Sequence, residues 1–364
     1  MNKINVTDFI RRDITRMDEY IPVPSLWDLS IKFNKRLDDV IKLDAGENQF
    51  GYGQSVSEAL KNGKYLNYYP DPEYKELRRS IAKYVGVRLD NIMVGSGSDE
   101  LLDLLLRLVL EPGDKVINCP PTFGIYSVLT ELNRGITISI KRNEDYSLNI
   151  ERIKNTVEDK VKVIIVCSPN NPTGTTSSAN EIISLLSIGK LVIVDEAYFE
   201  FCGKTVVSLV EKYDNLIVLR TFSKWAGLAG LRLGYGVMSP YIVKQLLKVK
   251  PPYNVNLMAE YAGVAALKET KASKRTIQTI VKERKRLAEA LRTVPYLRIY
   301  PSESNLLFMR VIGDLSKIRK YLESKCIAVR YYDSKVTGKA IRISIGRPEQ
   351  NNKLIQALRT YEQT

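Results

Sequence analysis

Four polar segments contain the residues whose types and spacing could do chemistry. The first, GSGSDE at residues 95–100, combines glycines that allow close backbone approach with Ser98, which can begin a helix. The free N–H groups of such a helix start suit a phosphate. The second, SPNNPTG at residues 168–174, is a rigid Pro- and Gly-containing turn that would fix the amide of Asn171. Each of these two motifs alone is common as a plain structural turn.

The other two segments carry the charged groups. Asp195-Glu196-Ala197-Tyr198 follows an apolar run, and its carboxylate could cap a helix or pair with a buried cation such as a protonated ring nitrogen. Thr221-Phe222-Ser223-Lys224 follows the next apolar run, with Arg232 shortly after. A lone lysine is usually a surface residue. Its place beside a carboxylate, an amide and a phosphate-type loop favours a chemical role for Lys224.

The chain contains no histidine. This excludes His-based zinc sites, Ser-His-Asp triads and histidine general bases. Acid–base chemistry must therefore come from Lys, Tyr, Asp, Glu or a cofactor. The cysteines have no CxxC spacing, so we expect buried free thiols and no metal site.

The elements that must position these segments follow an alternating pattern. Between the apolar runs, Asp99–Leu110 and Asn180–Leu186 have helical spacing. The alternation predicts an α/β domain with a largely parallel sheet, in which ligands bind at the carboxyl ends of the strands. The expected strands are Ile92–Val94, Lys115–Asn118, Ile136–Ile140, Val161–Cys167, Leu191–Asp195, Leu216–Arg220 and Leu233–Val237.

The C-terminal third predicts a smaller α+β domain that follows a helical stretch at Met258–Leu291. We expect the first 45 residues to join it. The predicted division is an N-terminal arm with part of the small domain at 1–48, a large domain at 49–259 and the small domain at 260–364. The expected elements of the small domain are strands Asn305–Val311, Ile327–Tyr332 and Ala340–Ile345, and helices Leu315–Ser324 and Gln350–Tyr361.

Composition bounds the partners and the location. The 364 residues have a net charge of +14, but the basic residues are scattered, which favours small anionic ligands over nucleic acid. No apolar run is long enough to span a membrane, and the N-terminus lacks an apolar signal core. We expect a cytoplasmic protein without a membrane partner.

The segments PNNPTG, DEAYFEF and RTFSKWAGLAGLRLGY, in this order, resemble the fold-type-I pyridoxal-phosphate enzymes, and more closely the histidinol-phosphate aminotransferase family. The resemblance covers nearly the whole chain, from KLDAGENQFG at residues 42–51 to IRISIGRPEQN at residues 341–351. It implies a large domain with a mostly parallel seven-stranded sheet flanked by helices, and a smaller α+β domain. It also implies pyridoxal 5′-phosphate as the cofactor.

The resemblance implies a role for each motif residue. Lys224 would hold the cofactor as a Schiff base and carry the proton, with Asp195 on the pyridinium nitrogen. Phe123 would stack on the ring, while Asn171 and Tyr198 would hydrogen-bond its phenolic oxygen. The phosphate would be held by backbone N–H groups around Ser98 and Asp99, by the Ser223 hydroxyl and by Arg232. Gly97 and Thr221 would also contact the cofactor. Tyr69 would reach the phosphate of a neighbouring subunit, which implies a homodimer.

The implied substrates are histidinol phosphate and glutamate or 2-oxoglutarate, in histidine biosynthesis. Arg342 would meet the α-carboxylate and Arg330 the phosphate of histidinol phosphate. Further substrate contacts would come from Tyr20, Asn48, Tyr69 and Asn171. Residues 46–49 read Gly-Glu-Asn-Gln where the family often has Asn-Glu-Asn-Pro, and residues 20–27 lack its Pro-Tyr signature. Because these departures lie at the substrate mouth, an aromatic aminotransferase and a threonine-phosphate decarboxylase remain alternatives.

Overall fold

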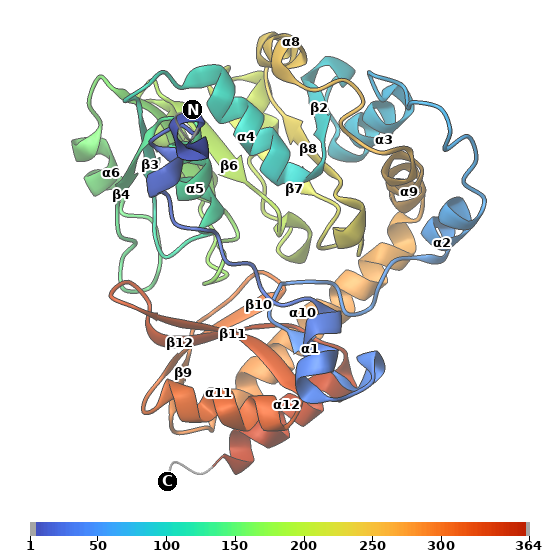
Figure 1. Ribbon diagram of the computed structural model, residues 1–364, viewed down its shortest axis with the longest axis vertical. Coiled ribbons are helices and arrows are strands. Elements are labelled where there is room, and N and C mark those ends of the chain that lie inside the picture. Colours follow the sequence, from blue (N-terminus) through green and yellow to red (C-terminus); the bar gives the residue numbers. More distant parts are fainter. Residues whose placement is uncertain (1–4, 362–364) are drawn as a thin grey trace.

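A seven-stranded sheet forms the centre of the large domain in the computed structural model, which describes residues 5–361 (Figure 1). The strand order is β2-β8-β7-β6-β5-β3-β4. β8 runs antiparallel to β2 and β7, and all other neighbours are parallel, so the predicted mostly parallel sheet is confirmed. The strands are β2 Ile92–Gly95, β3 Lys115–Asn118, β4 Ile136–Ser139, β5 Val161–Cys167, β6 Leu191–Asp195, β7 Leu216–Thr221 and β8 Gly234–Val237.

Helices pack on this sheet and on one another through their apolar faces. In α4, the leucines at 101, 102, 104, 105 and 106 are buried while Asp103 and Arg107 form an ion pair at the surface. α7 begins with a capping box formed by Ser178 and Glu181. The helices of the large domain are α2 Gln54–Lys61, α3 Lys75–Val85, α4 Gly97–Val109, α5 Ile125–Leu132, α6 Ile150–Thr156, α7 Ala179–Leu186, α8 Pro240–Val249 and α9 Leu257–Lys268.

A second sheet, in the order β1-β11-β12-β10-β9, organises the small domain. β1 pairs in parallel with β11, and the other pairs are antiparallel. The strands are β1 Ile41–Leu43, β9 Leu297–Ile299, β10 Leu306–Val311, β11 Ile327–Ser334 and β12 Gly338–Ser344. The helices are α1 Leu26–Phe33, α10 Thr270–Arg292, α11 Leu315–Ser324 and α12 Pro348–Thr360. Across both domains, the short 3₁₀ turns of the described residues are η1 Val6–Phe9, η2 Ile14–Arg16, η3 Leu37–Asp39, η4 Leu89–Asn91, η5 Phe199–Phe201, η6 Val207–Glu211 and η7 Ala229–Leu231.

The helical stretch predicted at Met258–Leu291 is two helices, α9 and α10, which are separated at Glu269. The Glu269 carboxylate accepts a hydrogen bond from the Ser55 backbone N–H at 2.9 Å, so this junction is tied to the large domain. α9 packs against α2 and α3, whereas α10 packs mainly against α12, β9 and β10 and also contacts η5 (Phe199–Phe201) of the large domain. This packing supports a domain boundary near Glu269 rather than at 259/260, and the division stays a proposal.

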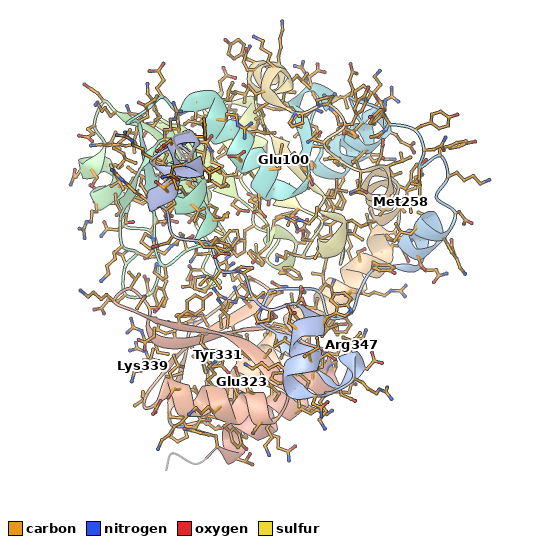
Figure 2. The ribbon with its side chains drawn as sticks, viewed as in Figure 1. Glu100, Met258, Glu323, Tyr331, Lys339 and Arg347 are labelled. Carbon is orange, nitrogen blue, oxygen red and sulfur yellow. The ribbon has the colours of Figure 1, made fainter. Side chains whose placement is uncertain are left out.

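The small domain faces the carboxyl ends of the large sheet. Glu303 joins the two: its backbone N–H donates to the Gly174 carbonyl at 2.8 Å, and its carboxylate pairs with Lys204 at 2.7 Å. Arg347 of the small domain donates to the Gln49 carbonyl at 2.7 Å (Figure 2). The N-terminal segment runs from the large domain down to α1 beside the small domain (Figure 1). Within residues 5–361 no helix is both long and apolar enough to cross a membrane.

Candidate active site

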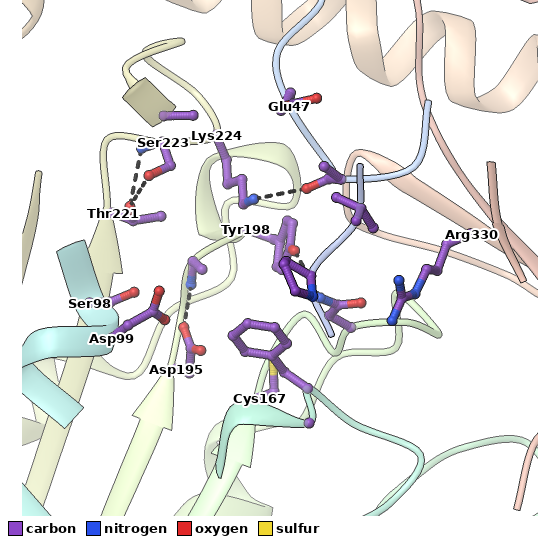
Figure 3. A pocket seen from close by; sticks show the side chains of 18 of the residues that line it. Glu47, Ser98, Asp99, Cys167, Asp195, Tyr198, Thr221, Ser223, Lys224 and Arg330 are labelled. Atoms are coloured by element: carbon purple, nitrogen blue, oxygen red, sulfur yellow. Dashed lines mark hydrogen bonds between the residues drawn. The ribbon is translucent and has the colours of Figure 1, made fainter. Parts of the chain in front are cut away.

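A pocket of about 670 Å³ lies where the two domains meet, at the carboxyl ends of β5, β6 and β7. The following residues predicted for the site line it: Tyr20, Ser98, Asp99, Phe123, Asn171, Asp195, Tyr198, Thr221, Ser223, Lys224, Arg232, Arg330 and Arg342. Figure 3 shows Lys224, Tyr198 and Asp195 around the same space, with Arg330 on its other side. Residues that are distant in sequence therefore converge on one cavity, as the strand-end motifs predict.

Lys224 occupies the wall of this pocket with a half-buried side chain. Its Nζ donates to the Ala45 carbonyl at 3.2 Å and lies 5.8 Å from the centre of the Tyr198 ring. Burial, followed by the positive charge of Arg342, lowers the pKa of the Lys224 amine to about 8. The amine is therefore neutral, and so nucleophilic, over a much larger fraction of time near pH 7 than an exposed lysine.

Asp195 places a buried carboxylate at the end of β6. Its Oδ2 accepts from the Tyr126 hydroxyl at 2.6 Å, and its Oδ1 accepts from the Ala197 backbone N–H at 3.0 Å. Burial raises the pKa of Asp195 to about 6, although these hydrogen bonds and Lys224 oppose the rise. The carboxylate is only 8% exposed, so a cation bound against it would relieve an unfavourable buried charge.

Asn171 links Tyr198 to the small domain. Its amide Nδ2 donates to the Tyr198 hydroxyl at 3.2 Å, while its Oδ1 accepts from Arg342 Nη1 at 2.9 Å. The Arg342 Nη2 donates to the Asp44 carbonyl, but its buried Nε has no hydrogen-bond partner among the described residues. An unpaired buried donor at a pocket wall suits an anionic ligand.

The start of α4 forms a compact cradle with the start of β8. Gly97 has a φ of +84°, and a β-carbon there would lie 2.8 Å from Arg232 Nη2. A β-carbon on Gly234 would lie 2.4 Å from the Ser98 nitrogen. The Ser96 side chain makes no capping hydrogen bond, and the Glu100 carboxylate accepts from the Ser96 backbone N–H at 2.6 Å. The next N–H groups of the helix are therefore available to an anion.

Hydroxyls and a guanidinium complete the cradle. The Thr221 hydroxyl donates to Ser223 Oγ at 2.9 Å and accepts from the Ser223 backbone N–H at 3.1 Å. Arg232 pairs with Asp99 at 3.1 Å. An N–H cradle, a carboxylate and an amine around one cavity match the phosphate, ring nitrogen and aldehyde of pyridoxal phosphate. The residues present therefore fit this group.

The substrate wall comes from the antiparallel pair β11 and β12. Arg330 and Arg342 are opposite each other in the register of these strands, and both line the pocket. Tyr20 reaches the same wall from the N-terminal segment. Burial raises the pKa of Tyr20, whereas the charge of Arg330 lowers it. Two guanidinium groups from neighbouring strands give this end two sites for anions.

Comparison with known proteins supports this geometry. The family model described as aminotransferase class I and II matches residues 38–358. The chain belongs to the class I and II aminotransferases. A protein named histidinol-phosphate aminotransferase from Dehalococcoides mccartyi is 42% identical over 97% of this chain and 98% of its own length. The chloroplastic histidinol-phosphate aminotransferase 1 of Arabidopsis thaliana is 42% identical over 97% of this chain and 86% of its own.

A solved structure has the same fold. The histidinol-phosphate aminotransferase from Sinorhizobium meliloti, crystallised with pyridoxal-5′-phosphate, superposes with a TM-score of 0.87. It is 24% identical, and the match covers 96% of each chain. The expected fold-type-I architecture is thereby confirmed. The family membership identifies the chain as a pyridoxal-phosphate-dependent aminotransferase.

Three residues predicted for the site of this aminotransferase do not line the pocket. Gly97 lies beneath the cradle, where its role is to let Arg232 approach. Asn48 has both amide groups engaged, since it donates to the Trp225 carbonyl at 3.0 Å and accepts from the Phe50 N–H at 3.0 Å. The structure thus gives Asn48 a local structural contact, and its predicted contact with substrate stays untested.

Tyr69 points outward. Its side chain is 79% exposed and stacks on Tyr253, with 4.4 Å between ring centres. Within one chain it contributes nothing to the pocket. Its predicted contact with the cofactor of a neighbouring subunit stays a prediction of the aminotransferase's dimer.

Sequence reasoning missed residues that position the others. Tyr126 holds Asp195, and its helical spacing from Phe123 within the PPTFGIY motif was a usable signal. Arg142 is buried and donates to the Cys119 and Tyr146 carbonyls at 3.1 Å and to Asn170 Oδ1 at 3.2 Å. It thereby supports the turn that carries Asn171. No pattern in the sequence distinguishes Arg142 from a surface arginine.

Proposed function

We propose that this aminotransferase transfers an amino group between histidinol phosphate and 2-oxoglutarate, as part of histidine biosynthesis. The observation that carries the proposal is the pairing of Arg330 with Arg342 across β11 and β12 at one wall of the pocket. One site must accept a dicarboxylate and a phosphate monoester in alternate half-reactions. Guanidinium groups bind both anions through paired N–H donors. The names of relatives 42% identical over nearly the whole chain support the same substrates.

The two arginines have different surroundings, which supports different roles. Arg342 is 6% exposed and is fixed by Asn171 and the Asp44 carbonyl, so it suits a carboxylate always held in the same place. Arg330 is half-buried, and its side chain forms no hydrogen bond with another described residue. We assign the α-carboxylate to Arg342 and the phosphate of histidinol phosphate to Arg330. Tyr20 would close the wall beside Arg330.

The cofactor would be held at three points. The N–H groups of Ser98 and Asp99, the Ser223 hydroxyl and Arg232 would bind its phosphate. Asp195 would bind its ring nitrogen, and Phe123 its ring face. When bound, pyridoxal phosphate supplies an electron-withdrawing ring that accepts the electron pair released at the substrate's α-carbon.

The remaining steps belong to residues of the chain. Lys224 Nζ would be the base that takes the proton from the substrate's α-carbon and would deliver it to the C4′ carbon of the bound cofactor, because its lowered pKa makes the neutral amine available. Asp195 stays anionic and keeps the ring nitrogen protonated. Tyr198 and Asn171 donate hydrogen bonds toward the ring oxygen. Burial of these groups excludes water and strengthens each charge interaction.

Single-turnover reactions with purified holoenzyme test the proposal. Histidinol phosphate, phenylalanine, tyrosine and threonine phosphate are offered separately, and loss of the cofactor's starting absorbance is followed. We expect histidinol phosphate to react with the highest second-order rate constant. If phenylalanine reacts at least as efficiently, the enzyme is an aromatic aminotransferase. Release of carbon dioxide from threonine phosphate would show a decarboxylase.

The assembly and location belong to the same proposal. We propose a homodimer in which Tyr69 reaches the cofactor phosphate of the neighbouring subunit, because its side chain is 79% exposed and does not line the pocket of its own chain. We also propose that the enzyme works in the cytoplasm on small molecules, without nucleic acid or membrane partners. Sedimentation of the purified protein tests the dimer.

A further inference from the structure

Tyr126 makes contacts with two groups of the cofactor site although its own ring is 1% exposed. Its hydroxyl donates to Asp195 Oδ2 at 2.6 Å. Its ring packs against Phe123 in a T-shaped arrangement, with 5.7 Å between centres and 86° between planes. Asp195 and Phe123 are the two residues proposed to meet the edge and the face of the cofactor ring. One buried side chain therefore touches both.

The position of Tyr126 is itself tightly fixed. It lies in the first turn of α5, and its carbonyl accepts from the Thr130 hydroxyl at 2.7 Å within that helix. The ring belongs to an apolar cluster with Leu105 and Ile193. At the outer side of the same helix start, Phe123 lines the pocket. The hydroxyl is thus presented to Asp195 by packing that involves no part of the substrate wall.

Asp195 needs such a donor. The charged groups that act on it are Lys224, which favours the carboxylate, and Asp99, which opposes it. The neighbouring Tyr126 and Cys167 are neutral, since burial raises the pKa of Cys167 to about 12 and that of Tyr126 well above its ordinary value. The Tyr126 hydroxyl therefore acts as a hydrogen-bond donor to an anion, the stronger kind of hydrogen bond.

We propose that Tyr126 is a positioning residue of this aminotransferase: through one hydroxyl and one ring it fixes Asp195 and Phe123 against the cofactor ring. This inference rests on the proposed function of the pocket. It predicts that Tyr126 acts on cofactor binding and on the chemical step, and leaves binding of the substrate's anionic groups to Arg330 and Arg342.

The first test compares Tyr126→Phe with wild type in the reconstituted holoenzyme. Because a hydrogen bond to a buried anion is lost, we expect the dissociation constant for pyridoxal phosphate to rise about 10-fold or more. In single turnover with histidinol phosphate, the maximal rate constant should fall by a similar factor. The half-saturating substrate concentration should stay within about twofold, because the anion sites are intact.

Tyr331→Phe is the matched control. The Tyr331 hydroxyl is buried and has no hydrogen-bond partner among the described residues, and its ring lies under Arg319 in the small domain (Figure 2). The Tyr331→Phe substitution removes the same hydroxyl oxygen from a tyrosine that does not line the pocket, so cofactor binding and turnover should match wild type. If both variants change equally, the effect of Tyr126→Phe is general destabilisation and the inference is wrong.

A double-mutant cycle tests whether Tyr126 acts through Asp195. The dissociation constant for pyridoxal phosphate is measured for Tyr126→Phe, Asp195→Asn and the double variant. We expect the penalty of Tyr126→Phe to shrink to less than about threefold in the Asp195→Asn background, since no anion remains to hold. If Tyr126→Phe raises the dissociation constant as much in the Asp195→Asn background as in wild type, the inference is wrong. If wild type itself binds no pyridoxal phosphate, the proposed function fails instead, so the two failures are distinguishable.

Discussion

The two walls of the pocket are held in different ways. On the large-domain wall, Asp195 and Thr221 follow neighbouring parallel strands, and each is buried and hydrogen-bonded within its own domain. On the small-domain wall, Arg330 is half-buried and Tyr20 is 41% exposed. The cofactor end is therefore preorganised, whereas the substrate end keeps freedom to rearrange. This difference matches the proposed reaction, in which one cofactor stays while two substrates of different shape alternate.

Removal of Lys224 would break the cofactor wall most severely. Lys224→Ala leaves no amine to hold the cofactor covalently or to carry the proton. We expect single-turnover transfer to fall about a thousandfold or more. The purified variant should lack the visible absorbance of the wild-type protein. Both quantities are measured on protein that has been loaded with pyridoxal phosphate and then freed of unbound cofactor.

Lys248→Ala is the control for this change. Lys248 lies exposed on α8, and its amine contacts only the nearby Gln245. Its replacement should leave absorbance and transfer unchanged. Transfer by Lys224→Ala at more than a tenth of the wild-type rate would contradict the role of Lys224.

The substrate wall is tested by replacing each of its two arginines alone. Arg342→Gln should reduce kcat/KM by about 10- to 100-fold for both glutamate and histidinol phosphate. The reason is that Arg342 also fixes Asn171, which serves both half-reactions. Arg330→Gln should reduce kcat/KM for histidinol phosphate by about 10-fold or more and that for glutamate less. Kinetics of each half-reaction measured alone give the four ratios.

Arg330→Lys serves as the partial replacement, since it keeps a charge but loses the paired donors. We expect it to recover part of the loss with histidinol phosphate. Equal losses for both substrates in Arg330→Gln would show that Arg330 does not distinguish the phosphate. The assignment of two anion roles to the two arginines would then be wrong.

The cofactor wall was also the part more accessible from sequence. Asp195, Thr221 and Asn171 lie directly after or at the ends of predicted strands, because apolar runs buried on both faces are distinctive and parallel strands end at one edge. The antiparallel direction of β8 was not accessible. An apolar strand has the same pattern in either direction, and its neighbours are set by tertiary packing.

The substrate wall depends on pairings that span most of the chain. β1 has only three residues, and it pairs with β11, whose partner residues are near position 328. Such a short strand has no periodicity to recognise. β11 and β12 were predicted as strands, but nothing in their pattern distinguishes Arg330 and Arg342 from surface arginines, so only the family resemblance pointed to these two residues. Asn48 shows where prediction from the family resemblance reaches its limit. Its amide is occupied by Trp225 and Phe50, contacts that no motif reveals.

The preorganised carboxylate carries a cost in stability that pH should reveal. The folded-state pKa of Asp195 is about 6, above its ordinary value of 3.8, so the cofactor-free fold favours the protonated form. The stabilisation that the protonated Asp195 carboxyl gives to the fold is fully present below pH about 4 and is lost as pH rises through 6. Relative to wild type, cofactor-free Asp195→Asn should therefore gain about 2 kcal/mol in free energy of unfolding between pH 4 and pH 7.

Urea unfolding of both cofactor-free proteins at several pH values measures this change. The difference between the two proteins is the relevant quantity, because the amide alters local hydrogen bonds by an amount that does not depend on pH. A difference that stays constant from pH 4 to pH 7 would contradict a buried, ionising Asp195. With cofactor bound, the order should reverse at neutral pH, since the carboxylate then has its cation.

The smallest expected effect comes from Tyr69, which belongs to neither wall within one chain. In the proposed dimer its hydroxyl completes the phosphate cradle of the neighbouring subunit. Tyr69→Phe should weaken pyridoxal phosphate binding about three- to tenfold, as expected for one hydrogen bond to an anion near solvent. Equilibrium binding to the cofactor-free protein measures this, and Tyr68→Phe, a neighbouring tyrosine that is 67% exposed, is the matched control.

Mixed dimers decide whether the hydroxyl acts across the interface. A dimer of one Tyr69→Phe subunit and one Lys224→Ala subunit has a single site with an intact lysine. That site receives the unaltered Tyr69 from its neighbour, so its cofactor affinity should return to the wild-type value. If Tyr69 acts within its own subunit, the same site stays weakened. Wild-type affinity in the mixed dimer would therefore show that the cofactor wall includes a residue from the neighbouring subunit, whereas the residues of the substrate wall come from one chain.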